Sequence, residues 1–517
     1  MAIDLAELPN DTQELKLFIV NQEKNHLEQI KRLESNVEVL SDELELLRHK
    51  IFGRSSEKLS EAEKLQMRLF DEAEQGAEKP VEIIEVPAHS RKKRGRRPLP
   101  ASLPREEIVH DIAEKDKVCS CGAALVRIGE DTSEQLGFVP AKVWAIRHIR
   151  PKYACKVCEG ANFGAGEKVV KIAPPPTQII PKSIATPSLL AYILVSKFCD
   201  ALPFYRQEKL FRRIGIDIPR STMCRWAVEV GRKCEPFIGL MHQEARAGPH
   251  ILMDETPLQV MGEAGRSDTS KSYMWVLRGG TPEHPVLLYQ YHPSRSAQVP
   301  LVYLKDYQGY LQTDGYRAYD EIGLLPGIIH VGCWGHSRRK FVEAQKPSKK
   351  AGSAEWAIAR IAKLYEIEKR LRALGLSDEE FVERRKREAL PILDNLHSWL
   401  EKKAQQVPPS TLLGRAIKYA LKQWHKLVRY LDEAFLTPDT NLVEQAIRPF
   451  AVGRRNWLFS GSPQGAYASA TLFSLIESAK ANGLEPYWYL GQIFERLPFV
   501  STEDDYRNLL PWNMLKK

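Results

Sequence analysis

Between residues 250 and 345 the sequence consists of short apolar segments that alternate with polar or glycine-rich turns. HILMDET, SYMWVLRGG and PVLLYQYHPS predict three consecutive strands, and their close succession favours antiparallel pairing. SAQVPLVYLKD then predicts a helix, GYLQTDGYRAY another strand, and IIHVGCWGHSRRKF a strand that runs into a basic helix. These segments predict an α/β core with the element order β-β-β-α-β-α-β.

Two carboxylates stand at strand ends in this core, Asp254 in MDET and Asp314 in QTDGY. The element order resembles the ribonuclease-H fold, in which acids at the ends of two neighbouring strands lie side by side. Two like charges at about 4 Å repel by about 4 kcal/mol at an effective dielectric of about 20. Both acids therefore need a cation between them, and two Mg²⁺ (or Mn²⁺) ions suit oxygen ligands and in-line displacement at phosphorus.

A third carboxylate would complete such a site, and Glu444 in PDTNLVEQAIRPF is the candidate. The segment predicts a short helix that is closed by Pro449. The spacing has a second interpretation, since Asn441 as N-cap with Glu444 three residues later is also a capping box. The local pattern leaves both interpretations open.

Four of the eight cysteines are grouped in a CxC and a CxxC pair, with 33 residues between the pairs. Four thiolates in two knuckles suit tetrahedral structural Zn²⁺ and leave no open position for catalysis. The alternative is four free thiols in a small β domain, and two histidines nearby are possible substitute ligands. The cysteines are Cys119, Cys121, Cys155 and Cys158, and the histidines are His110 and His148.

Residues 12–58 predict one long helix with apolar residues at alternating spacings of three and four. This spacing is typical of a two-stranded coiled coil that would pair protomers into a homodimer or higher oligomer. A helix that packs on its own protein is the alternative. The apolar positions are Ile30, Leu33, Val37, Leu40, Leu44, Leu47 and Ile51.

Lys and Arg exceed Asp and Glu by 75 − 66 = +9, and the excess is locally concentrated. The run RKKRGRR lies in a linker of acidic, then basic, then proline-rich sequence at residues 71–104. Such a run favours binding to a polyanion, and GRR before proline resembles a hook for the minor groove of double-stranded DNA. A solvated tail is the alternative. The cations are Arg91, Lys92, Lys93, Arg94, Arg96 and Arg97.

A proline-rich stretch at residues 173–182 precedes three predicted helices, Pro187–Leu202, Phe204–Ile214 and Ser221–Lys233. The turn GIDIP between the last two resembles that of a helix-turn-helix, with Ser221 as N-cap. A plain three-helix connector is the alternative. In the DNA-binding interpretation Arg220, Thr222 and Arg225 face the groove, and Trp226 lies in the core.

Two further groups combine cations with aromatic residues, and guanidinium groups bind phosphates well. In HVGCWGHSRRKF, we expect phosphate contacts beside the acids, with Trp334 packing or stacking on a displaced base. A metal site of His330, Cys333 and His336 is the less favoured alternative. The expected DNA-contacting residues are His336, Arg338 and Arg339 in this motif, and Arg448, Arg454, Arg455 and Trp457 downstream.

Residues 350–432 predict a helical insertion with two apolar stripes. One stripe contains Ala357, Ile361, Leu364, Ile367 and Leu371, and the other contains Ala416, Ala420, Trp424, Leu427 and Leu431.

Seven motifs in order are similar to the large transposase of the insertion-sequence-66 family: LRHKIFGRSSEKL, GRRPLPASLPREEIVHD, RPKYACKVC, MDET, LQTDGYRAY, HVGCWGHSRRKF and TNLVEQAIRPFAVGRRNWLFSGS. The resemblance implies a three-acid catalytic core on Asp254, Asp314 and Glu444. It also implies a DNA transposase that cleaves the 3′ ends of its element and joins them to target DNA, with small accessory proteins as possible companions. The chain departs from the family at Val443-Glu444-Gln445, where Ala-Glu-Arg is usual, and in its CxC knuckle.

The chain of 517 residues therefore predicts a multidomain α+β protein. Its longest apolar run, Leu189–Val195, is far shorter than the about twenty residues of a membrane span, and the acidic start predicts no secretory signal. We expect a cytoplasmic, nucleoid-associated enzyme. A nuclease or resolvase without strand transfer, and a non-catalytic DNA-binding regulator, remain alternatives. The expected domains are 1–70 (coiled coil), 71–104 (linker), 105–172 (zinc module), 173–245 (helix-turn-helix-like), 246–349 (first core part), 350–432 (helical insertion) and 433–517 (second core part).

Overall fold

The computed structural model describes residues 143–154, 170–346 and 352–514, together with some positions between residues 11 and 37. The chain divides into two units, of which one is Ala73–Pro176 and the other comprises Met1–Glu72 with Thr177–Lys517. In the smaller unit, β1 (Lys152–Ala154) pairs antiparallel with β2 (Val170–Ile172).

Several predictions lie outside the described residues, among them the basic run 91–97 and the four grouped cysteines. Most of the coiled-coil seam also lies outside them. Two of its positions, Ile30 and Val37, are described as helical and are exposed. The remainder of the seam and its pairing therefore stay predictions.

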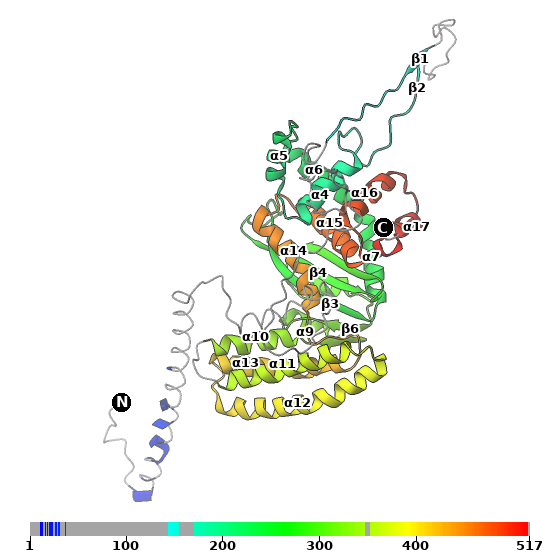
Figure 1. Cartoon of the computed structure of the whole chain (residues 1–517). Coiled ribbons are helices and arrows are strands. Elements are labelled where there is room, and N and C mark those ends of the chain that lie inside the picture. The colour runs from blue at the N-terminus through cyan, green and yellow to red at the C-terminus, as the bar shows by residue number, and fades with distance from the viewer. Residues whose placement is uncertain are drawn as a thin grey trace, which may run out of the picture. The chain divides into compact units, whose positions relative to one another are not determined.

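A five-stranded mixed sheet forms the centre of the larger unit, with the strand order β5-β4-β3-β6-β7 (Figure 1). The first three strands along the chain pair antiparallel, and the last two run parallel to β3. The predicted order β-β-β-α-β-α-β is confirmed. Its elements are β3 (His250–Gln259), β4 (Lys271–Gly280), β5 (Pro285–His292), α8 (Gln298–Tyr303), β6 (Gly309–Gln312), α9 (Arg317–Ile322) and β7 (Ile328–Val331).

Helices from both ends of the unit cover this sheet (Figure 1). Helix α7 packs on β4 and β5, α14 on β3 and β4, and α15 on β5, while α4 packs on α16. Large, fully buried side chains of these helices and of the sheet, including Phe237, Tyr289 and Phe473, share one apolar core. The covering helices are α4 (Pro187–Phe198), α5 (Phe204–Arg213), α6 (Arg220–Lys233), α7 (Glu235–Ala247), α14 (Asn441–Trp457), α15 (Pro463–Ala481), α16 (Pro486–Arg496) and α17 (Glu503–Asn508).

The three helices expected after residue 182 are present, with a correction at the start of the third. Helix α6 begins at Arg220, and Pro219 occupies the N-cap without a side-chain hydrogen bond, so the prediction of Ser221 as N-cap is wrong. Proline fixes a backbone angle that suits a helix start, and the N-cap lies two residues earlier than the hydroxyl of Ser221 suggested. Trp226 is buried, as predicted.

Side chains of α15 pair with the outer edge of β5. An edge strand leaves every second backbone group without a partner in the sheet. Ser474 Oγ accepts a hydrogen bond from the amide of Tyr289 at 2.7 Å, and Ser478 Oγ accepts one from the amide of Leu287 at 2.9 Å. Asn482 continues the row one turn later and donates to a β5 carbonyl at 2.9 Å. The helix therefore closes this edge of the sheet against other strands.

We expect Ser474→Ala to lower the free energy of unfolding by about 1–3 kcal/mol, because the buried amide of Tyr289 loses its acceptor. Ser469→Ala is the matched control, since the Ser469 hydroxyl donates within its own helix, to the carbonyl of Gly465 at 2.8 Å. That variant should stay within about 0.5 kcal/mol of the wild type. Urea unfolding of the full chain measures both, and equal losses would contradict the role of the edge contact.

Helices α10 to α13 form a second layer at the end of the sheet where β6 lies (Figure 1). They enclose their own apolar core, and every member of the two predicted stripes is buried except Trp424, which is half-buried. The expectation of a helical insertion is therefore confirmed in its helices and their apolar faces. The elements are α10 (Trp334–Gln345), α11 (Ser353–Arg372), α12 (Asp378–Gln406), α13 (Leu412–Leu427) and the 3₁₀ turn η3 (Val428–Leu431). Among the described residues, none of the helices combines the length and apolarity that crossing a membrane requires.

Candidate active site

Asp254 lies within β3, and Asp314 follows two residues after the end of the neighbouring parallel strand β6. Strand β3 pairs with β6 up to Leu252 and Gln312, where β6 ends. Continuing this register by two residues places Asp254 opposite Asp314. The prediction that Asp254 ends its strand is wrong, because β4 continues to pair with β3 as far as Gln259. Asp314 lies just beyond the end of β6, close enough to Asp254 for its charge to raise the pKa of Asp254.

The charges around Asp254 are mostly negative. Burial raises the pKa of Asp254 well above its usual value, and the charges of Glu255, Asp314 and Glu444 raise it further. One hydrogen bond opposes this shift, in which the amide of Glu255 donates to Asp254 Oδ1 at 2.8 Å. Asp314 Oδ1 accepts from the amide of Tyr316 at 2.9 Å. The polypeptide thus supplies little positive charge to Asp254, and a cation would relieve the repulsion.

Glu444 reaches this place because the chain returns from the helical layer to the ends of β6 and β7. Gln312 Nε2 donates to the carbonyls of Gly332 at 3.2 Å and Thr437 at 2.8 Å. The amide of Trp334 donates to the carbonyl of Pro438 at 2.8 Å. Helix α14 starts directly after these anchor points, so Glu444 in its first turn lies within the electrostatic range of Asp254.

The local structure around Glu444 differs from the sequence prediction. Helix α14 continues to Trp457 with Pro449 inside it, so the expected short helix is wrong. Thr440 rather than Asn441 is the N-cap, and no side chain caps the helix, which excludes the capping-box interpretation. Glu444 Oε1 instead lies 3.1 Å from the hydroxyl of Thr440.

Two basic side chains of α10 approach Glu444. His336 Nδ1 lies 3.7 Å from Oε1, and Arg339 lies 3.5 Å from Oε2. Burial lowers the pKa of His336, while the charges of Glu444 and Asp314 oppose this shift. Helix α10 therefore presents a histidine and an exposed arginine beside the acids, as expected for His336 and Arg339.

Cys333 also faces this group, whereas His330 does not. The ligand atoms of Cys333, His336 and Glu444 lie within 4.8 Å of one another, and over the described ranges this is the one such group of three His, Cys, Asp or Glu residues. His330 Nε2 lies 2.8 Å from the hydroxyl of Thr313, and burial lowers the pKa of His330 to about 3. The less favoured alternative, a metal site of His330, Cys333 and His336, is therefore wrong in His330, because Glu444 is the residue that lies beside Cys333 and His336.

Glu255, which the sequence interpretation did not single out, is a buried acid next to Asp254. Its carboxylate accepts from Arg295 Nε at 2.6 Å and from the hydroxyl of Tyr319 at 2.6 Å. The guanidinium of Arg295 lies 3.8 Å from the centre of the Tyr316 ring. Glu255 thus connects β3 to segments that precede and follow Asp314 in the sequence. The sequence feature that could have indicated Glu255 is its place as the second acid of MDET.

Two residues of the basic motif are buried. Trp334 is fully buried, donates from Nε1 to the carbonyl of Leu427 at 2.9 Å and packs edge-on against Trp424, so stacking on a displaced base is wrong. Arg338 is 6% exposed, and burial lowers its pKa, which does not fit the expected phosphate contact. Both side chains lie on the α10 face that packs on the helical layer, and their cationic or aromatic character alone could not reveal this.

The other expected DNA-contacting residues divide between packed and exposed positions. Arg454 bonds the hydroxyl of Thr256 at 3.1 Å and the carbonyl of Pro257, so it joins α14 to β3. Trp457 is half-buried, and Lys197 Nζ lies 5.4 Å from its ring centre. These two residues therefore stabilise packing. Thr222 is half-buried, and the exposed side chains are Arg220, Arg225, Arg448 and Arg455.

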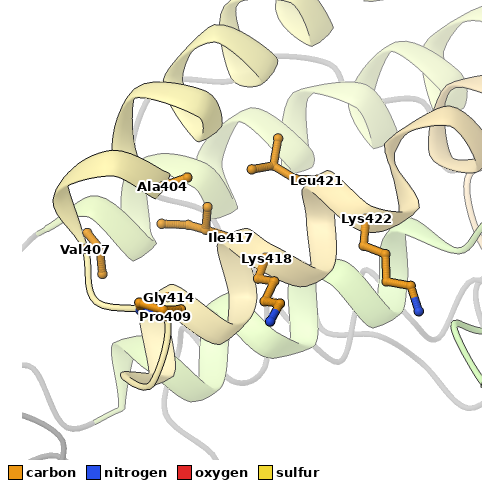
Figure 2. Close-up of a pocket in the computed structure, with 8 residues that line it drawn as sticks. All are labelled: Ala404, Val407, Pro409, Gly414, Ile417, Lys418, Leu421 and Lys422. Carbon is orange, nitrogen blue, oxygen red and sulfur yellow. The ribbon is translucent and has the colours of Figure 1, made fainter. Parts of the chain in front are cut away.

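A separate pocket lies where α12 ends and α13 begins, as Figure 2 shows. Its lining is largely apolar, with Lys418 and Lys422 along one side. Lys422 also forms an ion pair with Asp320 at 3.5 Å. None of the three acids lines this pocket, so it is not the site that they form.

Comparison with protein families gives the class of this protein. Residues 182–468 match the model described as Transposase IS66 family. Three flanking segments match further models of IS66-type transposases, described as Transposase C of IS166 homeodomain (39–108), zinc-finger binding domain of transposase IS66 (116–159) and IS66 C-terminal element (474–512). The first match covers more than half of the chain, so the protein belongs to the IS66 transposase family.

Two proteins of Sinorhizobium fredii (strain NBRC 101917 / NGR234) are similar over most of their length. The uncharacterized protein y4jD is 34% identical over 80% of this chain and 81% of its own. The uncharacterized protein y4qI is 30% identical over 99% of both. The family supports a transposase role with DNA as partner, and the zinc-finger match includes all four grouped cysteines, which supports a structural Zn²⁺.

Proposed function

We propose that the protein cleaves the 3′ ends of its element and joins them to target DNA, with Asp254, Asp314 and Glu444 as the catalytic acids of a ribonuclease-H-like core. The single observation that carries this proposal is the β3–β6 register, which ends at Leu252 and Gln312, two residues before Asp254 and Asp314. The strand order β5-β4-β3-β6-β7, with three antiparallel strands and two parallel ones, supports the proposed fold class.

The residues at the site fit divalent cations. Three carboxylates offer hard oxygen ligands. Burial raises the pKa of Asp254, and the negative charges of Glu255, Asp314 and Glu444 raise it further, so a cation would stabilise the ionised form. We propose that Asp254 and Asp314 hold two Mg²⁺ or Mn²⁺ ions and that Glu444 completes the ligand set. Bound there, the ions supply an activated oxygen nucleophile and charge stabilisation at the leaving oxygen.

The other residues position these acids and the DNA. Glu255, held by Arg295 and Tyr319, keeps β3 and the segment after β6 together, so the two aspartates keep their spacing. Arg339 is exposed next to Glu444 and can bind a phosphate of the strand that enters the site. These contacts account for binding and orientation, while the acids provide the reacting centre.

The reaction consists of two displacements at phosphorus. Water attacks the phosphodiester, a new P–O bond forms, and the bond to the 3′ oxygen of the element end breaks. That oxygen takes up a proton, and the attacking water releases one to solvent. The freed 3′-OH then attacks a target phosphodiester, loses its proton and expels the target 3′ oxygen, which is protonated in turn. No covalent bond to the enzyme forms.

The remaining expectations complete this proposal. We propose that residues 91–97, the zinc module with Cys119, Cys121, Cys155 and Cys158, and helices α5 and α6 recognise the element ends. The exposed Arg220 and Arg225 of α6 support the last of these. A coiled coil over residues 30–51 would pair two protomers on two ends, with accessory proteins of the element as further partners in a nucleoid-associated complex.

A strand-transfer assay with pre-cleaved element ends and supercoiled plasmid tests the proposal. We expect joined product in Mg²⁺ or Mn²⁺ and none in a chelator. Cleavage of uncut ends without any joined product would favour the nuclease or resolvase alternative. Binding to the ends with neither reaction would favour the regulator, and the three acids would then need another explanation.

A further inference from the structure

The N-termini of α10 and α14 bring together three side chains of metal-ligand type. Cys333 is the N-cap of α10, His336 lies three residues later, and Glu444 lies in the first turn of α14. Because residues three apart lie on the same face of a helix start, the thiol and the imidazole point in one direction. Their ligand atoms and a Glu444 oxygen lie within 4.8 Å of one another.

One ring nitrogen of His336, Nδ1, lies beside Cys333 and Glu444 without a hydrogen bond. This nitrogen is buried, and Glu444 Oε1, at 3.7 Å, is beyond hydrogen-bond distance. A buried ring nitrogen without a partner is unfavourable. Coordination to a cation between Nδ1 and Oε1 would satisfy it.

Thr440 holds the sulfur of Cys333 next to His336 and Glu444. Cys333 is 2% exposed, and its Sγ lies 3.2 Å from the hydroxyl of Thr440 and 3.4 Å from the Thr440 amide. The same hydroxyl lies 3.1 Å from Glu444 Oε1. Thr440 therefore fixes the sulfur and the carboxylate on adjacent sides of one small space.

We propose that Cys333, His336 and Glu444 bind a transition-metal ion, Zn²⁺ in the first place. One sulfur, one imidazole nitrogen and one carboxylate oxygen suit Zn²⁺, whereas Mg²⁺ prefers oxygen alone. Three protein ligands leave one position for solvent in a four-coordinate site. On binding, the thiol proton of Cys333 passes to solvent and a metal–sulfur bond forms.

Such an ion would fix the side chain that we propose as the third acid. Glu444 Oε1 faces the sulfur and the imidazole, while Oε2 faces Arg339. With Oε1 bound to this ion, Glu444 would keep Oε2 for the Mg²⁺ or Mn²⁺ ions that we propose at Asp254 and Asp314. The ion would also link α10 of the helical layer to α14, which packs on the sheet. This metal site depends on the three ligand atoms and not on the proposed reaction, because the metal content of the protein can be measured without DNA.

The metal content of the purified full chain, kept reduced and dialysed against a weak chelator, tests this inference. We expect about two Zn²⁺ per chain in the wild type, one from the zinc-finger segment and one from this group, and about one in Cys333→Ala. Cys234→Ala is the matched control, because Cys234 is equally buried but has no place in the group. It should keep about two.

A second measurement identifies the ligand. With Co²⁺ in place of Zn²⁺, the wild type should show more thiolate-to-metal absorption than Cys333→Ala, and His336→Asn should bind the second Co²⁺ at least about tenfold more weakly. Circular dichroism verifies folding, and His336→Asn serves if Cys333→Ala does not fold. Equal metal content in the wild type, Cys333→Ala and His336→Asn would overturn the inference, whatever the strand-transfer assay gives.

Discussion

Asp254→Asn is expected to reduce cleavage and strand transfer by about three orders of magnitude or more. The substitution keeps the shape of the side chain but removes the charge that would hold the cations beside Asp314. Metal-ion stabilisation of a developing phosphoryl charge is worth several kcal/mol, and each 1.4 kcal/mol corresponds to about a factor of ten in rate. The measurement is the initial rate of joined product from pre-cleaved ends in Mg²⁺.

The stability of the same variant distinguishes a lost ligand from a damaged fold. Burial and neighbouring acids raise the folded-state pKa of Asp254 above its unfolded value. An acid of this kind destabilises the fold as pH rises above the unfolded pKa, and the loss is complete above the folded pKa. Without divalent ions at neutral pH, Asp254→Asn should therefore unfold at the same temperature as the wild type or a higher one.

Divalent ions should reverse this order. Mg²⁺ that binds only the folded wild type raises its unfolding temperature, whereas the variant should gain little. Affinity for element-end DNA should remain, because Asp254 contributes no positive charge to it. A variant that keeps strand transfer within about tenfold of the wild type would remove Asp254 from the catalytic role.

The order of helices and strands along the core and the closeness of Asp254 to Asp314 could be predicted from the sequence because they depend on local signals. Strands of period two end in glycine or polar turns, and an acid after an apolar strand is visible in a single stretch such as QTDGY. What the sequence did not show is how long β3 continues past Asp254. That extension depends on pairing with β4, which is a non-local contact.

The third acid illustrates the limit more clearly. The local pattern around Glu444 suits a capping box as well as a catalytic acid, and only the resemblance to a family favoured the second. The structure excludes the capping box because the helix starts at Asn441 behind Thr440. The approach of Cys333 to Glu444 depends on the return of the chain through Thr437 and Pro438, which no periodicity in the sequence indicates.

The cationic residues were predicted least well, because residue type does not determine which side of a helix is covered. Arg338 and Arg339 are adjacent in the sequence, yet one is buried against the helical layer and the other is exposed. Arg454 was expected on DNA, and its bonds to Thr256 and Pro257 give it a packing role instead. Burial of a cation becomes visible only when its neighbours are known.

Arg385→Ala is expected to lower the free energy of unfolding by about 3–5 kcal/mol, the loss typical of breaking a buried ion pair from one side. Arg385 is fully buried and lies 3.4 Å from Glu368 of α11. It also donates to the carbonyls of Leu436 at 3.1 Å and Glu433 at 2.5 Å. These two carbonyls belong to the segment that returns from the helical layer toward Glu444, so the substitution should loosen the path that positions the third acid.

Arg384→Ala is the control for this effect, because Arg384 is the adjacent residue of α12 and also forms an ion pair with a glutamate. Its bond to Glu380 measures 2.8 Å, but both side chains are exposed, at 40% and 47%. An exposed pair four residues apart on a helix contributes about 0.3–0.5 kcal/mol. Urea unfolding of both variants at neutral pH measures the difference. Near-equal losses would show that the buried guanidinium does not hold the return segment, and strand transfer by Arg385→Ala should then match that of Arg384→Ala.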